Sequence, residues 1–368
     1  MRRCFPALPL CGALLIAAPL MAATPAPAER CHRFAPLDTP GFTADPAAHV
    51  FDGKLHVYVS HDIEGPPLPD VAPFLGSEGN AFRMRDYRLL VMDRVGGTVE
   101  TVDDLLSLEQ VPWAARQMWA PDVATRAGRY YLYFPAKDHD GQFRIGVAVA
   151  DSPRGPFKAD PMPIAGTFSI DPTAFVDDDG QAYLYFGGRS GGQLERHVAP
   201  VIAGSAPGAK DAVYMPQVAR LHEDMRHLAE APRNALIVNT DGSTPTAAQR
   251  ERQFFEGAWV HKRAGVYHLL YSTGEHRTLA HATAGSPYGP FTFRGTVLLP
   301  VTGWTTHASI VPHDGRWWLF HADSQRSGKT WLRTTKVAEL HYREDGSIET
   351  IDPFVAPDAH GACAVAGR

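Results

Sequence analysis

Five copies of one strand-and-turn pattern constrain the fold of this chain more than any other feature. Each copy has a turn glycine followed by a run of alternating large residues, and these glycines are Gly53, Gly128, Gly180, Gly265 and Gly315. They lie 75, 52, 85 and 50 residues apart along the chain. Alternating β-branched and aromatic residues predict strands, and a preceding glycine supplies the positive φ of a hairpin turn. A period near 50 residues, lengthened twice by insertions, is typical of propeller blades. We therefore predict an all-β protein, a five-bladed β-propeller.

The segment Ser169–Gly188 (SIDPTAFVDDDGQAYLYFGG) shows the pattern most clearly. An acid before proline, Asp171, opens the first strand, and an acidic turn ending in Gly180 leads into the aromatic second strand. A second repeated motif supports this pattern, because SPRGPF at 152–157 follows the second copy and SPYGPF at 286–291 follows the fourth. We expect each of these turns to close a blade.

The residues eight or nine positions before each turn glycine carry chemistry rather than packing. They are Asp45, Trp119, Asp171, Glu256 and His307. Equal phase in a repeat predicts an equivalent place in the fold, so these side chains should surround one mouth of the central channel. Taken singly, each has a structural alternative, such as a turn for Asp45 or core packing for Trp119. Their shared phase favours a catalytic ring.

Three carboxylates on one channel wall point to acid–base hydrolysis of a glycosidic bond. Such a reaction needs one protonated carboxyl to protonate the leaving oxygen and one carboxylate to activate water. Glu256 lies among aromatic residues, where desolvation favours its neutral form, so we assign it as the general acid. Asp45 is assigned as the general base. Asp171 would orient Glu256 and raise its pKa by like-charge repulsion.

The ends of the chain indicate export. Residues 1–28 begin with Arg2 and Arg3 and continue into an apolar stretch too short to span a membrane, which predicts a secretory signal peptide. Residues 29–368 would then form a single catalytic propeller domain, periplasmic or secreted. Cys31 and Cys363 remain after signal removal, and in an oxidising compartment they predict a disulfide. The alternative is two free thiols in loose tails.

Charge and composition exclude several kinds of partner. The formal net charge is −5 without a basic run, so neither nucleic acid nor a membrane surface is an expected partner of the mature chain. The sequence indicates no oligomeric state. Two insertions, 64–79 and 189–253, interrupt the repeat. They either wall a pocket over the channel or decorate the surface.

Five motifs in order resemble those of glycoside hydrolase family 43. They begin at Ala44 (ADPAAHVFDG), Met118 (MWAPDV), Ile170 (IDPTAFVDDDG), Phe255 (FEGAWVHK) and Thr306 (THASIVPHDG). The resemblance spans about Phe42 to Ile351, nearly all of the predicted mature chain. It implies a five-bladed propeller and an inverting mechanism on glycosides of xylose and arabinose. It also implies the same three roles for the three acids.

The resemblance adds expectations about binding. It implies that Trp119 and His307 belong to the substrate site and that Arg333 is a sugar-binding arginine. No cofactor is expected for the chemistry, although a structural Ca²⁺ held mainly by water near His307 is implied. The expected partner is an oligosaccharide from plant cell-wall hemicellulose.

The expected activity is that of an exo-acting β-xylosidase that releases xylose from β-1,4-xylo-oligosaccharides. The short tail after Pro353 favours small oligosaccharides over insoluble polymer. The alternative is an α-L-arabinofuranosidase acting on arabinoxylan or arabinan fragments, or an enzyme with both activities. A propeller that binds sugar without cleaving it is the alternative outside catalysis.

Overall fold

The computed structural model describes Met1 and residues 34–37, 39–76, 79–202, 212–274, 277–304, 306–357 and 363–365. The chain divides into two units, Met1–Arg30 and Cys31–Arg368, and the fold below is that of the second. Apart from Met1, the predicted signal peptide lies outside the described residues, as does Cys31 of the predicted disulfide. Among the described residues, no helix is long and apolar enough to cross a membrane.

Five sheets, antiparallel apart from one parallel pair in the fourth, confirm the predicted propeller. The first blade contains β2 (Phe42–Phe51), β3 (Lys54–Asp62), β4 (Asp86–Met92) and β5 (Glu100–Ser107). The second contains β7 (Asp122–Arg126), β8 (Arg129–Asp138), β9 (Phe143–Ala150) and β10 (Lys158–Ala159), with β6 (Ala114–Arg116) also paired to β8. The third contains β11 (Thr173–Val176), β12 (Ala182–Phe186), β13 (Gln217–Arg220) and β14 (Arg233–Asn234).

The last two blades each include a strand from outside their own repeat. The fourth contains β16 (Glu256–Arg263), β17 (Val266–Ser272), β18 (Leu279–Ala284) and β19 (Phe291–Leu298), with β15 (Ile237–Val238) parallel to β19. The fifth contains β20 (Ala308–His313), β21 (Arg316–Asp323) and β22 (Thr334–Leu340), and its outer strand is β1 (Phe34–Pro36). The N-terminal strand thus completes the C-terminal blade.

Short elements occupy the connections. These are the 3₁₀ turns η1 (Leu108–Gln110), η2 (Ser190–Gly192), η3 (Leu194–Arg196) and η4 (Arg250–Arg252), and the strand pair β23 (Val355–Pro357) and β24 (Cys363–Val365).

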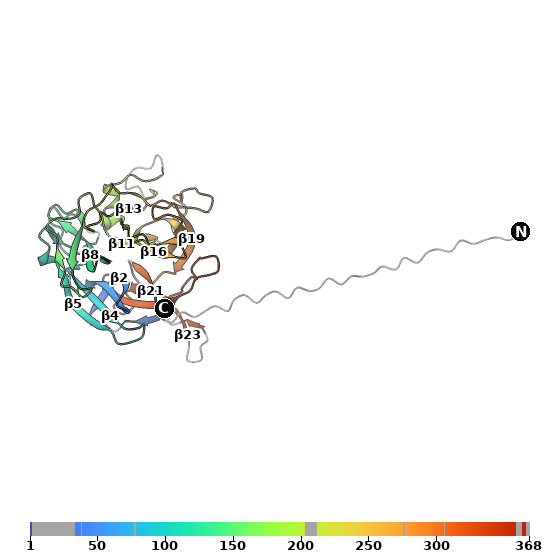
Figure 1. Cartoon of the computed structure of the whole chain (residues 1–368), viewed down its shortest axis with the longest axis horizontal. Helices are drawn as coiled ribbons and strands as arrows, with labels where there is room; N and C mark the ends of the chain where they lie inside the picture. Colours follow the sequence, from blue (N-terminus) through green and yellow to red (C-terminus); the bar gives the residue numbers. More distant parts are fainter. Residues whose placement is uncertain are drawn as a thin grey trace. The chain divides into compact units, whose positions relative to one another are not determined.

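The innermost strands β2, β7, β11, β16 and β20 contact one another in that order around the ring. Figure 1 shows the sheets following one another around a common centre, with β11 and β16 close to it and β5 and β19 at the rim. The start of each innermost strand therefore lies near the channel, where the repeat phase places the predicted site residues.

The turn glycines behave as the repeat predicts. Four of the five hairpins have two-residue turns in which both residues have positive φ, as in Asp52 (51°) and Gly53 (74°). Such turns match the twist of antiparallel strands. The third-blade hairpin differs, because Val176 pairs with Ala182 and leaves a five-residue loop that ends near Gly180.

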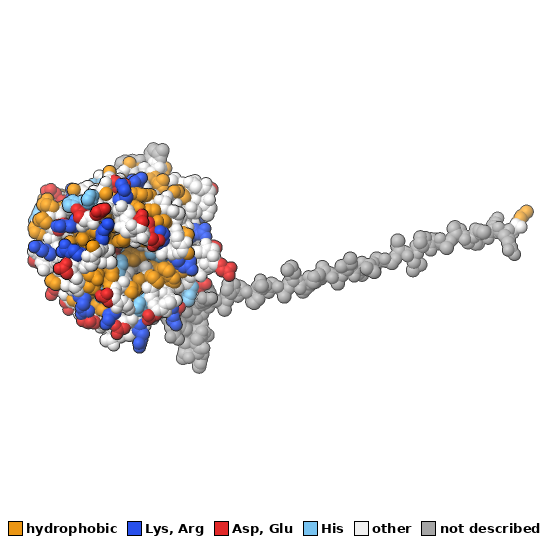
Figure 2. Space-filling view, in the orientation of Figure 1, with side chains coloured by type: hydrophobic (Ala, Val, Ile, Leu, Met, Phe, Trp, Pro, Cys, Tyr) orange, Lys and Arg blue, Asp and Glu red, His pale blue; other side chains and the backbone are white. Residues whose placement is uncertain are grey.

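Tyrosines join neighbouring blades at the two proline-rich turns. The hydroxyl of Tyr58 in the first blade donates to the carbonyl of Pro153 at 2.6 Å. The hydroxyl of Tyr185 in the third blade donates to the carbonyl of Pro287 at 2.5 Å. Each proline-rich turn therefore accepts a hydrogen bond from a tyrosine of the preceding blade. Acidic and basic side chains are mixed over the face shown in Figure 2.

Candidate active site

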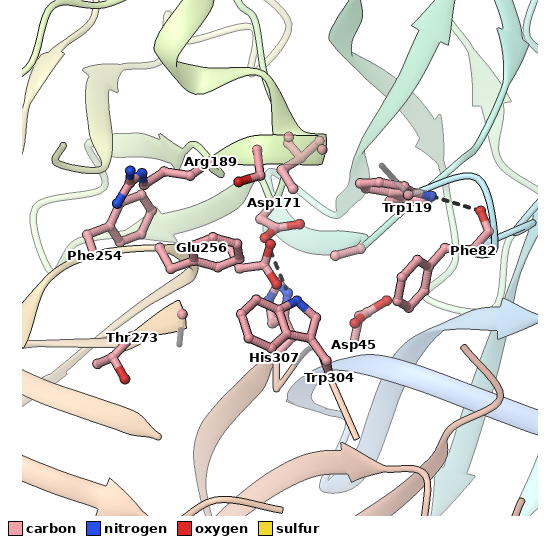
Figure 3. Close-up of a pocket in the computed structure, with 18 of the residues that line it drawn as sticks. Asp45, Phe82, Trp119, Asp171, Arg189, Phe254, Glu256, Thr273, Trp304 and His307 are labelled. Atoms are coloured by element: carbon pink, nitrogen blue, oxygen red, sulfur yellow. Dashed lines mark hydrogen bonds and ion pairs between the residues drawn. The ribbon is translucent and has the colours of Figure 1, made fainter. Parts of the chain in front are cut away.

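One cavity of about 560 Å³ brings together all five residues of equal repeat phase. Its lining includes Asp45, Trp119, Asp171, Glu256 and His307, and also Arg333. Figure 3 shows that Asp171, Glu256 and His307 lie near its middle, with Asp45, Phe82 and Trp119 on one side and Phe254 and Arg189 on the other. The predicted ring residues therefore share one site.

Irregularities in the backbone orient the side chains of the three acids. Asp45 has φ 51° and lies at a bulge in β2, and Asp171 has φ 56° just before β11. Glu256 begins β16, whose register with β17 shifts directly after it. Aspartate tolerates positive φ better than most residues, and bulges next to active sites re-aim side chains. All three acids are buried.

Arg333 is fully enclosed and pairs with two carboxylates. Its Nη1 and Nη2 donate to Oδ1 and Oδ2 of Asp45 at 2.6 and 3.1 Å. Its Nε and Nη2 donate to Oδ2 and Oδ1 of Asp62, both at 2.9 Å, and its backbone N–H donates to Oδ2 at 2.8 Å. Burial opposes the charge on this guanidinium, but the two carboxylates raise the pKa of Arg333 well above its usual value. The fork fixes the orientation of Asp45.

Asp171 lies in a strongly electronegative environment. Burial, followed by the charges of Glu256 and Asp45, raises the pKa of Asp171 well above its usual range. The backbone N–H of Gly257 donates to its Oδ2 at 2.9 Å and opposes this shift. The charges of Asp171 and Glu256 therefore oppose joint ionisation of the two carboxyls.

His307 contributes an uncharged ring. Its Nδ1 lies 3.8 Å from Oδ2 of Asp171. Burial lowers the pKa of His307, which favours the neutral imidazole at neutral pH.

Aromatic residues cover the side of the cavity nearest Asp45. The indole Nε1 of Trp119 donates to the carbonyl of Phe82 at 3.2 Å, and the two rings lie edge to face. A Cβ on Gly79 would lie 2.5 Å from the Trp119 ring, so only glycine fits there. This packing fixes the Trp119 indole against the cavity.

Both insertions reach the cavity. Gly79 from the first insertion and Arg189, Glu195 and Gln253 from the second are among the lining residues. Of the two hypotheses for the insertions, the structure therefore supports the first, because described residues of both insertions form part of the cavity wall.

The repeat does not predict five further residues at or beside the site, which are Asp62, Phe82, Arg189, Phe254 and Trp304. These residues lie outside the equal-phase positions, and three-dimensional packing brings them to the site. Only Asp62 had a sequence signal, because it is an acid at the end of the alternating run that follows Gly53, and it is buried in the structure.

A family profile described as glycosyl hydrolases family 43 matches residues 99–348, more than half of the chain. The chain belongs to this family. It is therefore a glycoside hydrolase of an inverting family, and the resemblance noted in its motifs is confirmed. The alternative of a sugar-binding propeller without catalysis has no support from these findings.

Relatives match this family 43 enzyme along most of their length. Xylosidase/arabinosidase 43A of Humicola insolens is 48% identical over 331 residues, covering 87% of this chain and 99% of that protein. The solved GH43_1 enzyme from Xanthomonas citri complexed with xylotriose is 50% identical, with a TM-score of 0.79 and coverage of 88% and 94%.

A second solved relative is a β-xylosidase/α-arabinofuranosidase from a compost microbial metagenome, in a calcium-free form with xylotriose. It is 47% identical, with a TM-score of 0.80 and coverage of 88% of this chain and 99% of that one.

Proposed function

We propose that this enzyme releases xylose from the ends of β-1,4-xylo-oligosaccharides derived from plant hemicellulose, with inversion at the anomeric carbon. The observation that carries the proposal is the convergence of Asp45, Asp171 and Glu256 on one cavity. The names of relatives that pair xylosidase with arabinosidase, and the xylotriose bound in two of them, support the substrate class.

The proposed mechanism divides the work among three acids. Glu256 donates its proton to the glycosidic oxygen as the bond to the anomeric carbon breaks. Asp45 accepts a proton from a water molecule that attacks the opposite face of the sugar, and this yields the inverted hemiacetal. Asp171 helps Glu256 to keep its proton until it is needed.

The other proposed site residues act by position. Arg333 was expected to bind sugar, and its contacts with Asp45 support a more specific role in orienting the base. Trp119 would pack against the sugar, and His307 would offer it a neutral ring nitrogen.

Product stereochemistry and leaving-group dependence test this mechanism. Proton NMR during early turnover of 4-nitrophenyl β-xyloside should detect α-xylose first, whereas β-xylose as the first-formed anomer would refute inversion. Glu256→Ala should lower kcat/KM by roughly 10²–10⁴-fold on xylobiose and by much less on xylosides with good leaving groups, which need little protonation. Asp45→Ala should abolish both reactions. Equal losses for Glu256→Ala on all leaving groups would refute its role as the acid.

An α-L-arabinofuranosidase activity is the second candidate. The name of the relative from Humicola insolens and that of the relative from the compost metagenome combine the two activities, and the two sugars present similar hydroxyls. Comparing kcat/KM on aryl β-xyloside and aryl α-L-arabinofuranoside decides the order of preference. An enzyme active on the arabinofuranoside alone would overturn the xylosidase proposal.

Family 43 enzymes need no cofactor for the chemistry. A structural Ca²⁺ near His307 is a separate proposal. No group of three or more His, Cys, Asp or Glu side chains that could hold a metal occurs in the described part of the chain. The neutral His307 ring and the nearby acids fit an ion held mainly by water. When bound, it would supply positive charge close to the acids. Activity and melting temperature that both stay unchanged after exhaustive chelation would refute this role.

Export and a disulfide are proposed from the sequence. Residues 1–28 would direct the enzyme to the periplasm or the medium, and Cys31 would bridge to Cys363 in the mature chain. Such a bond would stabilise the fold by roughly 4–5 kcal/mol in the chain-entropy model. N-terminal sequencing of the exported protein and mass spectrometry of its thiols test both. An unprocessed N-terminus would refute the signal, and two free thiols would refute the bridge.

A further inference from the structure

If the proposed function holds, the roles of Glu256 and Asp45 determine which way the oligosaccharide lies in the cavity. The acid protonates the leaving oxygen, while the base serves water on the opposite face of the released sugar. The rest of the oligosaccharide must therefore extend past Glu256, away from Asp45. Figure 3 shows Arg189 and Phe254 on that side of Glu256.

Arg189 belongs to loop 187–195, which is pinned to the strands that carry the acids. The hydroxyl of Ser169, two residues before Asp171, accepts the N–H of Gly188 at 2.9 Å. The backbone N–H of Arg189 donates to the carbonyl of Phe255 at 2.9 Å, next to Glu256. The loop is therefore built as a fixed part of the wall.

Two opposite charges in this loop have unused hydrogen-bonding capacity. Nε of Arg189 and Oε2 of Glu195 are buried, and neither has a hydrogen-bond partner among the residues that the structure describes. Both side chains line the cavity, but no ion pair within the described part of the chain joins them. The Arg189 guanidinium instead lies over the ring of Tyr214, 5.2 Å from its centroid. Buried polar groups are costly when unpaired, so a ligand or ordered water should satisfy them.

We propose that Arg189 and Glu195 bind adjacent hydroxyl groups of the leaving-group sugar and so determine the preference for xylo-oligosaccharides. A hydroxyl can accept from the planar guanidinium fork and donate to a carboxylate, so a vicinal diol satisfies both side chains at once.

Arg189→Met tests this assignment because it keeps most of the side-chain length over Tyr214 and removes the donors. We expect kcat/KM to fall on xylobiose at least tenfold more than on 4-nitrophenyl β-xyloside, whose leaving group has no vicinal diol. Glu195→Gln should show the same selective pattern with a smaller loss. The matched control is Arg196→Met, because Arg196 lies in the same insertion but is exposed.

Equal losses on the two substrates for Arg189→Met, or no loss on xylobiose, would overturn the inference. Thermal unfolding shows whether each variant is folded, and Arg189→Lys, which keeps the charge without the fork, replaces Arg189→Met if that variant is unfolded. A wild-type enzyme that cleaves neither xyloside would instead refute the proposed function, so the two failures are distinguishable.

Discussion

Arg333 shows how one side chain organises both the site and its surroundings. It is 1% exposed and forms ion pairs with Asp45 and Asp62, which are themselves buried. A buried ion pair adds little net stability compared with an apolar substitute, but removing one partner leaves an uncompensated charge. Asp45 and Asp62 therefore depend on Arg333 for their place in the interior.

Arg333→Met should lower the free energy of unfolding by about 3–5 kcal/mol, because two buried carboxylates lose their counterion. Denaturant unfolding measures the change. Adding Asp62→Asn to Arg333→Met should restore part of the stability without restoring activity, since Asp45 still lacks its orienting partner. An unchanged unfolding midpoint for Arg333→Met would contradict this account.

Asp171→Asn should shift the basic limb of the kcat/KM profile to lower pH. The charge of Asp171 opposes ionisation of its neighbour, so removing that charge lets Glu256 lose its proton more easily. The pH dependence on xylobiose measures the limb. A limb that stays in place or moves to higher pH would show that Asp171 does not raise the pKa of the acid.

At the residue scale, repeat phase was enough to identify from the sequence five residues that line one cavity. It succeeded because equivalent positions of successive blades face one channel. Asp62 and Arg189 could not be found in this way, because their places depend on long-range packing. The sequence could suggest Arg333 but not its contacts, since Asp45 and Asp62 lie 288 and 271 residues away along the chain.

At the scale of single elements, the fourth blade contains three stacked histidines. His261, His268 and His281 come from β16, β17 and β18, with ring centroids 4.9 and 5.0 Å apart. Nδ1 of His268 lies 2.8 Å from Nε2 of His281. Burial lowers the pKa of His268 to about 4 and that of His281 to about 3. The fourth blade therefore requires uncharged imidazoles.

Acid should destabilise the fourth blade between about pH 6.5 and 3. Unfolded histidines take up protons below their usual pKa of about 6.5, whereas the folded ones resist protonation, so the unfolded state gains protons as the pH falls. Each such proton costs up to about 1.4 kcal/mol of unfolding free energy per pH unit. The stabilisation is complete above this window and is lost within it.

A variant carrying His268→Gln and His281→Gln should show a flatter dependence of unfolding free energy on pH than the parent enzyme. His222→Gln, which removes an exposed histidine, is the control and should leave the slope unchanged. Parallel curves for the double variant and the parent would exclude the stack as a source of acid sensitivity.

Hairpins were the elements best predicted from the sequence. A glycine with positive φ followed by alternating large residues is a local signal, and all five copies form paired strands. The strand β1 carried no such signal. Its three residues are strand only because β22, more than three hundred positions later, offers an unpaired edge.

At the scale of the whole propeller, several contacts fasten the last blade to the start of the chain. Phe34 pairs with Ala338, and the N–H of Leu37 donates to the carbonyl of Thr335 at 3.1 Å. The hydroxyls of Thr43 and Thr335 lie 3.0 Å apart. The ring is therefore closed by strand pairing, whether or not the proposed disulfide adds to it.

An enzyme that begins at Thr39 should unfold at a lower temperature than one that begins at Phe34. The shorter chain loses β1 and the buried Leu37, whose burial alone is worth roughly 2 kcal/mol. Both chains lack Cys31, so the comparison separates strand pairing from the disulfide. Equal melting temperatures would mean that β1 contributes nothing to closure.

The pairing of β1 with β22 also sets an order of events during synthesis. Phe34 emerges from the ribosome 304 residues before its partner Ala338. At typical rates of 5–20 residues per second, that strand waits roughly 15–60 s. Four blades can form in the meantime, but they remain an open arc with unpaired edges that other chains could join. The need for chaperones should therefore be greatest just before the fifth blade is synthesised. It should end when β1 pairs with β22.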